Sequence, residues 1–437
     1  MRILLIEARI TGKPAYDKRL SNRLNIYPSL ALAQLAGITP GKHEVEAIFE
    51  RYQNVDFEWD GDLVGISCLT TVAPRAYEIA DRFRKKGTKV VLGGWHPSAL
   101  PMEAKEHADS VVIGEAEIIW PQLLDDLEKN ELKPFYKNEK PVDLGCIRHA
   151  NRDINQGISF VAGIQASRGC PMGCEFCGVT NSQHGRIFRK RSVENVVEEI
   201  KTIRQKHLYF YDPSMTINPD YAKQLFKAMQ GLNKKFICFG NIDVLGEDDE
   251  LLELASEAGC ENWFVGFESI SQETINKLGK KSNKVENYAS SIKKIHEHGM
   301  AVIGAFIFGF DTDTKDVFDN TAKMIYDLSI DIAELTILTP YPGTPLFDRL
   351  DEEGRILTKD WSKYNYTNVV FQPKYMTAEE LSDSVKESSK KWFSSPNIIK
   401  RAITTQKYGI RVSASILLLN LGTKKLWKSA ANTIFQK

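Results

Sequence analysis

The feature that most constrains the fold is a repeated alternation of short apolar segments with helical patterns. In the first 130 residues we expect strands at Arg2–Glu7, Glu44–Glu50, Asp62–Cys68, Lys89–Gly93 and Ser110–Ile113. Helical patterns lie at Pro28–Gly37, Pro74–Lys86 and Glu115–Lys129. Strands that alternate with helices build a parallel, doubly wound α/β sheet, which binds its ligands at the carboxyl ends of the strands. Here those ends carry residues 67–71, 93–98 and 114–117.

A second strand–helix series follows. Its expected strands are Ser159–Gln165, His207–Tyr211, Phe236–Gly240, Asn262–Phe267, Ala301–Phe308 and Ile332–Leu338. Six such repeats predict a partial (β/α)6 barrel of the TIM type, with its working face at the carboxyl ends of the strands. We therefore divide the chain into a first domain (1–130), a linker (131–157), a barrel (158–348) and a mainly helical C-terminal region (349–437).

The charge balance separates the end of the chain from the rest. The 437 residues include 57 basic and 57 acidic side chains, a balance that does not suggest a whole-chain nucleic-acid binder. From Lys386 onward, however, eleven side chains are basic and one is acidic, so this tail carries +10 and residues 1–385 carry −10. We find neither a signal peptide nor the roughly 18 consecutive apolar residues of a spanning helix.

Three of the seven cysteines stand close together directly after the first barrel strand. Cys170, Cys174 and Cys177 have the spacing C-x3-C-x2-C within SRGCPMGCEFCGVT. Three thiolates on one loop can bind a soft metal centre. A [4Fe–4S] cluster would keep one iron open for a substrate, whereas zinc would need a fourth ligand, for which His184 is the nearest candidate. Chance thiols are the remaining alternative. We expect the other four cysteines to be small buried apolar residues.

This spacing, with the aromatic Phe176 before the last cysteine, resembles the radical SAM superfamily. The resemblance implies that the open iron binds S-adenosylmethionine (SAM), which the reduced cluster cleaves to a 5′-deoxyadenosyl radical. It places Phe176, Asp212 (LYFYDP), Glu268 (FVGFES) and Gly304 (AVIGAFIFGF) at SAM. For Glu268 the alternative is an acid at a helix N-terminus, and for Gly304 it is close backbone packing. Arg189 and Arg191 could meet an anionic group or belong to a solvated charge run.

The first domain resembles the cobalamin-binding domain of a large radical SAM subfamily, akin to class B methyltransferases. The matching segments are YPSLALAQLAG, GISCLTT, GGWHPSALP and VVIGEAE. The resemblance implies a cobalamin site at Ser67, Thr70, Thr71, Gly93, Gly94, His96, Gly114 and Glu115. Because the D-x-H-x-x-G signature is absent, we expect cobalamin to be bound without a histidine ligand. The alternatives are a turn histidine at His96 and a plain turn at Ser67–Thr71.

In that subfamily, the commonest reaction methylates an unactivated carbon with a methyl group carried by cobalamin. We therefore expect a methyltransferase that acts on a small or lipid-like metabolite with an external one-electron donor of the flavodoxin or ferredoxin type. The alternatives are an oxidase or cyclase of the same type and a non-catalytic metal-cluster sensor or binding protein. Basic and aromatic residues in the tail also suggest peripheral contact of a cytoplasmic protein with the inner membrane surface. A solvated helical face is the alternative, and a nucleic-acid partner is not expected.

Overall fold

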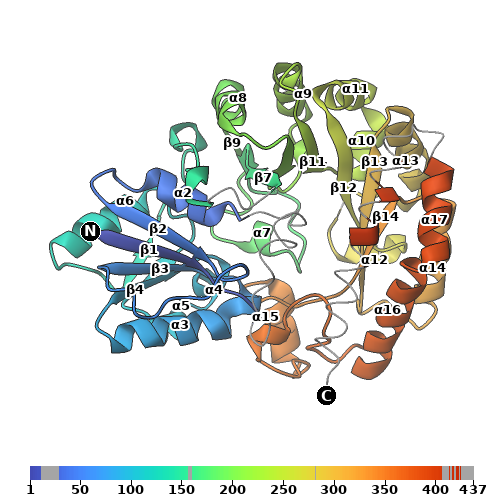
Figure 1. The fold of residues 1–437 in the computed structure, drawn as a ribbon. Coiled ribbons are helices and arrows are strands. Elements are labelled where there is room, and N and C mark those ends of the chain that lie inside the picture. Colours follow the sequence, from blue (N-terminus) through green and yellow to red (C-terminus); the bar gives the residue numbers. More distant parts are fainter. Residues whose placement is uncertain are drawn as a thin grey trace.

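The computed structural model contains two parallel sheets that lie side by side (Figure 1). It describes residues 1–10, 29–155, 160–280 and 282–405, together with residues 413, 416, 417, 420–422 and 424. Within these residues, no helix is both long and apolar enough to cross a membrane. The order of elements is a first α/β domain, a barrel-like α/β domain and C-terminal helices, which confirms the expected fold class.

The first sheet has the strand order β2-β1-β3-β4-β5-β6, and all its strands are parallel. The strands are β1 (Arg2–Glu7), β2 (Glu44–Phe49), β3 (Leu63–Ser67), β4 (Lys89–Gly93), β5 (Ser110–Ile113) and β6 (Phe135–Lys137). Its helices are α2 (Ala31–Ile38), α3 (Ala73–Lys85), α4 (Trp95–Ala99), α5 (Pro101–His107) and α6 (Ile119–Glu128). Helix α3 packs on one face, and α2 and α6 pack on the other, because the central strands are apolar on both sides. The direction of winding changes between β1 and β3.

Strand β6 lies in the segment that we predicted as a linker. Its three residues pair with β5 and extend the first sheet, and Tyr136 is buried. A strand of three residues is too short to show a period, so the sequence pattern does not mark it. Pro28, the first residue of the expected helix Pro28–Gly37, lies outside the described residues, and helix α2 begins at Ala31.

The second sheet has its strands in chain order, from β7 to β14, and they too are all parallel. They are β7 (Val161–Ile164), β10 (His207–Phe210), β11 (Lys235–Phe239), β12 (Cys260–Glu268), β13 (Ala301–Phe308) and β14 (Ile332–Ile337). The outer helices include α8 (Val193–Thr202), α9 (Pro219–Met229), α11 (Asp249–Ala258), α13 (Tyr288–Glu297) and α14 (Val317–Asp327). They cover one face of the curved sheet (Figure 1), and this confirms the partial six-stranded barrel.

The C-terminal region contains α15 (Pro345–Glu352), α16 (Ala378–Trp392) and α17 (Ser395–Thr404). Thr377 and Glu380 form a capping box at the start of α16. Trp392 and Phe393 are two of the aromatic residues of the basic tail, but they are buried in the barrel core and do not contribute to an exposed membrane surface. Sequence alone does not show which face of α16 packs. Tyr408, Trp427 and Phe435 lie outside the described residues.

Candidate active site

The three cysteines lie on a loop between β8 (Ser167–Arg168) and the short helix α7 (Gly178–Asn181). The Thr180 hydroxyl donates to the carbonyl of Cys170 at 2.7 Å. The Asn181 amide donates to the carbonyls of Cys174 and Cys177 at 2.9 and 2.8 Å. These bonds fix the loop backbone without using the thiols. Sequence reasoning missed Thr180 and Asn181, although both follow directly after the motif.

Two glycines shape the same loop. Gly169 and Gly173 have φ values of +85° and +76°, which strain residues with a side chain. A Cβ atom on Gly169 would lie 2.1 Å from the carbonyl oxygen of Ile187. After the motif, a Cβ atom on Gly178 would lie 2.4 Å from the ring of Trp95 in the first domain. The loop is therefore tightly enclosed, and Trp95 brings the first domain into contact with it.

The cysteine side chains fit an iron–sulfur cluster better than a zinc ion. Burial raises the pKa of Cys174 to about 12 and also raises that of Cys177, so a bound metal must displace thiol protons. No three His, Cys, Asp or Glu side chains converge on one point among the residues that the structure describes. Zinc requires such convergence, whereas each thiolate of a [4Fe–4S] cluster binds a separate iron at its own corner. His184 does not complete a single-ion site with the three thiols.

Glu268 ends β12 and lies beside the cysteine loop. Its side chain is almost buried, its φ is +62°, and its carboxylate lies 2.5 Å from Nζ of Lys280. Lys280 also donates to the carbonyl of Gly266 at 2.6 Å. Burial is the main cause of the raised pKa of Cys174. The charge of Lys280 lowers this pKa, and that of Glu268 raises it. The pair is therefore close to the thiols. Sequence reasoning missed Lys280, and the assignment of Glu268 to SAM stays a prediction.

Asp212 has a different role from the predicted contact with SAM. It is 1% exposed, and its carboxylate accepts a hydrogen bond from the Ser167 hydroxyl at 2.6 Å. The backbone N–H of Ala166 donates to it at 3.0 Å. Burial raises the pKa of Asp212 to about 6, and the bond from Ser167 opposes this shift. The carboxylate therefore holds the start of the cysteine loop, and no part of it is open to a ligand.

Gly304 is also placed differently from the prediction. A Cβ atom there would lie 3.0 Å from the ring of Phe267, which belongs to the core between the sheet and its outer helices. Gly304 thus points away from the barrel interior, and close packing explains it better than a contact with adenine. Phe176 packs against Phe310, with ring centroids 6.2 Å apart, just beyond the end of β13. Its contact with SAM stays a prediction.

A cavity of about 620 Å³ lies between the two sheets. Five of the predicted cobalamin residues line it, namely Ser67, Gly93, Gly94, Gly114 and Glu115. The barrel side contributes Gln165, Arg168, Arg191, Glu199 and Tyr211. The glycines expose backbone, so a large flat ligand can approach closely. At Gly94, φ is +100° and a Cβ atom would lie 3.0 Å from the backbone of Cys68. This lining fits cobalamin.

Three other predicted cobalamin residues do not line this cavity. His96 is completely buried, its Nε2 lies 3.1 Å from Glu103, and its ring packs 5.2 Å from that of Trp361. Glu103 also accepts a hydrogen bond from the Trp361 indole at 3.0 Å. The imidazole is therefore held away from the cavity, which favours the alternative of a histidine that is satisfied by the protein, and a contact of His96 with cobalamin stays a prediction. Thr70 and Thr71 lie in the turn before α3, and Thr70 is 1% exposed.

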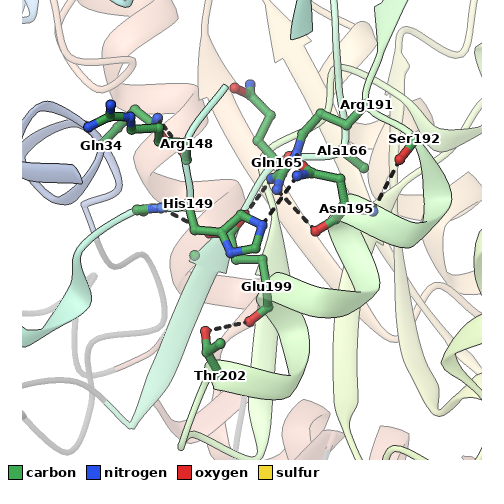
Figure 2. Close-up of polar contacts among 12 residues, drawn as sticks. Gln34, Arg148, His149, Gln165, Ala166, Arg191, Ser192, Asn195, Glu199 and Thr202 are labelled. Atoms are coloured by element: carbon green, nitrogen blue, oxygen red, sulfur yellow. Dashed lines mark hydrogen bonds and ion pairs between the residues drawn. The ribbon is translucent and has the colours of Figure 1, made fainter. Parts of the chain in front are cut away.

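The predicted anion-binding arginines are paired with protein carboxylates in the wall of the cavity. Arg189 contacts Glu115 at 2.7 and 2.9 Å. Arg191 contacts Glu199 at 2.5 Å and donates to the carbonyl of Gln165 at 3.0 Å. Figure 2 shows Arg191 between Gln165 and the side chains of α8. The Arg189–Glu115 pair joins the two domains, whereas Arg191 and Glu199 both belong to the barrel. Both arginines are paired, so an anionic ligand is not needed to explain them.

One further arginine joins the first domain to the cysteine loop. Arg168 contacts Glu117 at 2.5 Å and Glu115 at 3.2 Å, across the domain boundary. It also donates to the side chain of Gln165 at 2.8 Å. Since Arg168 is two residues before Cys170, the loop and the cavity share one network of ion pairs.

Comparisons with known proteins agree with this arrangement. Residues 164–325 match a family described as the radical SAM superfamily, and residues 21–124 match a B12 binding domain. The chain is 32% identical to bacteriochlorophyllide d C-12(1)-methyltransferase of Chlorobaculum tepidum, over 78% of this chain and 76% of that protein. It is also 32% identical to the C-8(2)-methyltransferase of that organism, over 78% and 80%. The cobalamin-dependent SAM radical enzyme OxsB, solved with aqua-cobalamin, has a TM-score of 0.70 at 16% identity and covers 98% of this chain and 71% of its own.

Proposed function

Because this chain belongs to the cobalamin-dependent radical SAM methyltransferases, we propose that it methylates an unactivated carbon of a large, mainly apolar ring molecule of the tetrapyrrole type. Its cofactors are a [4Fe–4S] cluster, SAM and cobalamin. The observation that carries the proposal is the shared cavity, since residues next to the cysteine loop line the same space as the glycines of the first sheet. The substrate class rests on the two bacteriochlorophyllide methyltransferases.

When bound, the cluster supplies the electron that cleaves SAM, and cobalamin supplies the methyl group. The chain's own residues position these groups and keep water away. Thr180 and Asn181 hold the cluster loop, and the ion pair of Lys280 with Glu268 keeps a fixed charge beside it. Aromatic side chains line the adjacent barrel interior and exclude water from a reactive radical.

The individual sites are part of this proposal. We assign the cluster to Cys170, Cys174 and Cys177, and the SAM neighbourhood to Phe176 and Glu268 with Lys280. The cobalamin site comprises the cavity-lining residues Ser67, Gly93, Gly94, Gly114 and Glu115. We keep the division into 1–130, 131–157, 158–348 and 349–437, with β6 added to the first domain.

The test is anaerobic purification, reconstitution with iron, sulfide and cobalamin, and incubation with SAM, a reductant and bacteriochlorophyllide d. We expect a product heavier by one methylene unit, together with S-adenosylhomocysteine and 5′-deoxyadenosine. A panel of other tetrapyrroles and polycyclic lipids tests the breadth of the substrate class. Deoxyadenosine with an oxidised or cyclised product and no methylated product would contradict methyl transfer.

The electron donor and the membrane contact are separate parts of the proposal. We infer a flavodoxin- or ferredoxin-type donor, which reduction of the cluster by such a protein in place of a chemical reductant would test. The surface of α17 supports contact with an anionic membrane, because Ile399 and Ile403 are exposed on either side of Lys400. Flotation with anionic vesicles should therefore fall on deletion of residues 396–437. Equal flotation of both proteins would contradict this contact.

A further inference from the structure

The inner face of the barrel carries a wall of aromatic side chains. Along β11 and β12, alternate residues face the outer core, and those between them face inward and are half-buried. Phe239 and Phe264 are inward residues with ring centroids 4.7 Å apart. The ring of Tyr209, on β10, lies 5.8 Å from that of Phe239. Three strands thus present one apolar surface to the barrel interior.

A carboxylate stands at the other end of the same inner face. Glu334 on β14 is half-buried, whereas its neighbours Ala333 and Leu335 belong to the outer core. The strand register places Glu334 in one row with Ala305 of β13 and Gly266 of β12. Glu268 and Lys280 fill the position that a Cβ atom on Gly266 would take, so this row runs from their ion pair to the carboxylate of Glu334. Its charge acts on the hydroxyl of Tyr209 across the barrel.

Tyr366 reaches this region from the C-terminal segment on a strained backbone. Its φ of +64° is rare for a residue with a bulky side chain and costs about 1–3 kcal/mol. The end of β14 imposes it, because Ile337 N–H donates to the Tyr366 carbonyl at 2.7 Å and Thr339 Oγ1 accepts from Tyr366 N–H at 3.2 Å. Two residues earlier, Tyr364 is buried in the core of the first domain.

The phenol ring of Tyr366 is partly exposed at the end of β14. The residue is 51% exposed to water, and its ring lies 5.4 Å from that of Tyr341. Burial nevertheless raises the pKa of Tyr366, Tyr341 opposes the shift, and the charges of Cys177 and Glu334 add to it. The backbone bonds of Tyr366 to Ile337 and Thr339 place the residue at the carboxyl end of β14. That end of the strands is the working face of a parallel barrel, so the exposed part of the ring lies where a ligand can reach it.

We propose that Tyr366 is a specificity-determining substrate contact that closes the barrel interior opposite the aromatic wall. Together with that wall and Glu334, it frames a site for a rigid, mainly apolar ring body that bears a hydroxyl or N–H group for Glu334 to accept. This deepens the proposed function and rests on it. A glycine at position 366 would remove the backbone strain, so Tyr366→Gly removes the ring without adding strain to the fold.

Binding of two matched probes to the full-length protein tests the contact. One is a zinc chlorin with a hydroxyethyl group, and the other is the vinyl chlorin without the hydroxyl; both are followed by fluorescence quenching. We expect Tyr366→Gly to weaken both by about tenfold, the cost of losing one aromatic contact. Glu334→Gln should weaken the hydroxyethyl probe more than the vinyl probe. The matched control is Tyr375→Gly, which removes an exposed tyrosine from the same segment.

A second measurement does not depend on the chlorin. Loss of cluster iron to a chelator should be several-fold faster in Tyr366→Gly than in the native protein, because the ring no longer covers the carboxyl end of the barrel, and unchanged in Tyr375→Gly. The variant should remain folded, since glycine suits the positive φ. If the native protein binds neither chlorin but the chelator effect appears, the tetrapyrrole proposal fails and the placement of Tyr366 stands. If Tyr366→Gly changes neither measurement, the inference is overturned.

Discussion

The two sheets of this chain are built from the same repeat but present their ligand sites in different ways. The first changes its winding direction between β1 and β3, so helices cover both faces and the free space lies at the strand ends. The second keeps its strands in chain order and curves, so helices cover its outer face and the inner face remains available. The order of the strands, more than the repeat itself, therefore decides where a ligand can bind.

The two sites also differ in what their residues contribute. At the first sheet, glycines open a space next to the backbone. At the barrel, the site is formed by side chains, namely the cysteines, the Lys280–Glu268 ion pair and the aromatic rings of the inner face. If this contrast is correct, a substitution at one site should leave binding at the other largely intact.

The largest expected effect is that of Cys174→Ala. Since only three thiolates anchor the cluster, we expect SAM cleavage to fall to background, while the protein still binds cobalamin. Iron and sulfide analysis, the corrinoid absorption spectrum and deoxyadenosine formation measure the three properties. Cys238→Ala is the matched control, because that thiol is buried in the barrel core. Loss of cobalamin together with the cluster would break the distinction between the sites.

Gly94→Ala should have the opposite effect to Cys174→Ala, because it should weaken cobalamin binding and not the cluster. Gly94 and Gly87 both have positive φ values, +100° and +89°, so alanine at either strains the backbone, at a cost of about 1–3 kcal/mol of folding free energy. At Gly94 the added Cβ atom also meets the Cys68 backbone at 3.0 Å, whereas at Gly87 nothing lies within 4 Å. We therefore expect cobalamin affinity to fall about tenfold or more in Gly94→Ala alone, in equilibrium dialysis. Equal affinities in the two variants would contradict the glycine-lined site.

Thr180→Val should have a smaller effect, confined to the barrel site. It removes the bond to the Cys170 carbonyl and the 3.2 Å bond that Thr180 accepts from Gly173 N–H, which together stabilise the loop by about 1–3 kcal/mol. We expect faster loss of cluster iron to a chelator and unchanged cobalamin binding. Thr202→Val, which removes a comparable bond at the end of α8, is the control. Native-like iron retention in Thr180→Val would show that the loop does not depend on this hydroxyl.

The smallest expected effect is a difference in how the two regions respond to pH. Burial raises the pKa of Asp212 and Asp313 in the barrel to about 6. Their stabilising contribution is therefore complete below their usual pKa and is lost as the pH rises through about 6. Despite burial, hydrogen bonds from His96 and from Arg189 hold the pKa of Glu103 and Glu115 below the usual value. Those two groups stabilise the first domain at higher pH and lose this effect as the pH falls below about 4.5.

Acidification from about pH 7 to about pH 5 should consequently stabilise the barrel by about 2 kcal/mol and leave the first domain unchanged. Hydrogen exchange, corrected for the intrinsic effect of pH, measures the two sheets separately. In Asp313→Asn, β13 should lose much of its response, because asparagine keeps an acceptor oxygen but does not titrate in this range. If acidification increased hydrogen-exchange protection equally in the first sheet and in the barrel, the expected difference between the two regions would be contradicted.

The sequence predicted the features that local pattern determines. The alternation of apolar segments with helical patterns predicted both sheets, and the cysteine spacing predicted the cluster loop. Both features depend on residues that are close together in the sequence. Side-chain direction was harder to predict. His96 is drawn into a network by Trp361, far away in the chain, and Gly304 points outward because of its strand's register.

The residues that sequence reasoning missed have the same explanation. Lys280 belongs to no sequence motif, and only its ion pair with Glu268 on the preceding strand identifies it as a residue of the site. Tyr366 is marked only by a backbone conformation that three-dimensional packing imposes. Strand β6 is too short to show a period. In each case the missing information is a contact between residues that a linear pattern does not relate.

The segment around Tyr364 and Tyr366 has a consequence for recombination between related enzymes. Tyr364 packs into the first domain and the backbone of Tyr366 is hydrogen-bonded to the end of β14, so a few residues near the C-terminus belong to both units. A crossover placed in the linker would separate the N-terminal module from the tyrosine and tryptophan that complete its core. Functional chimeras should therefore require two junctions, with the N-terminal donor also supplying the stretch around Trp361–Tyr366. Exchange of modules during evolution would face the same restriction.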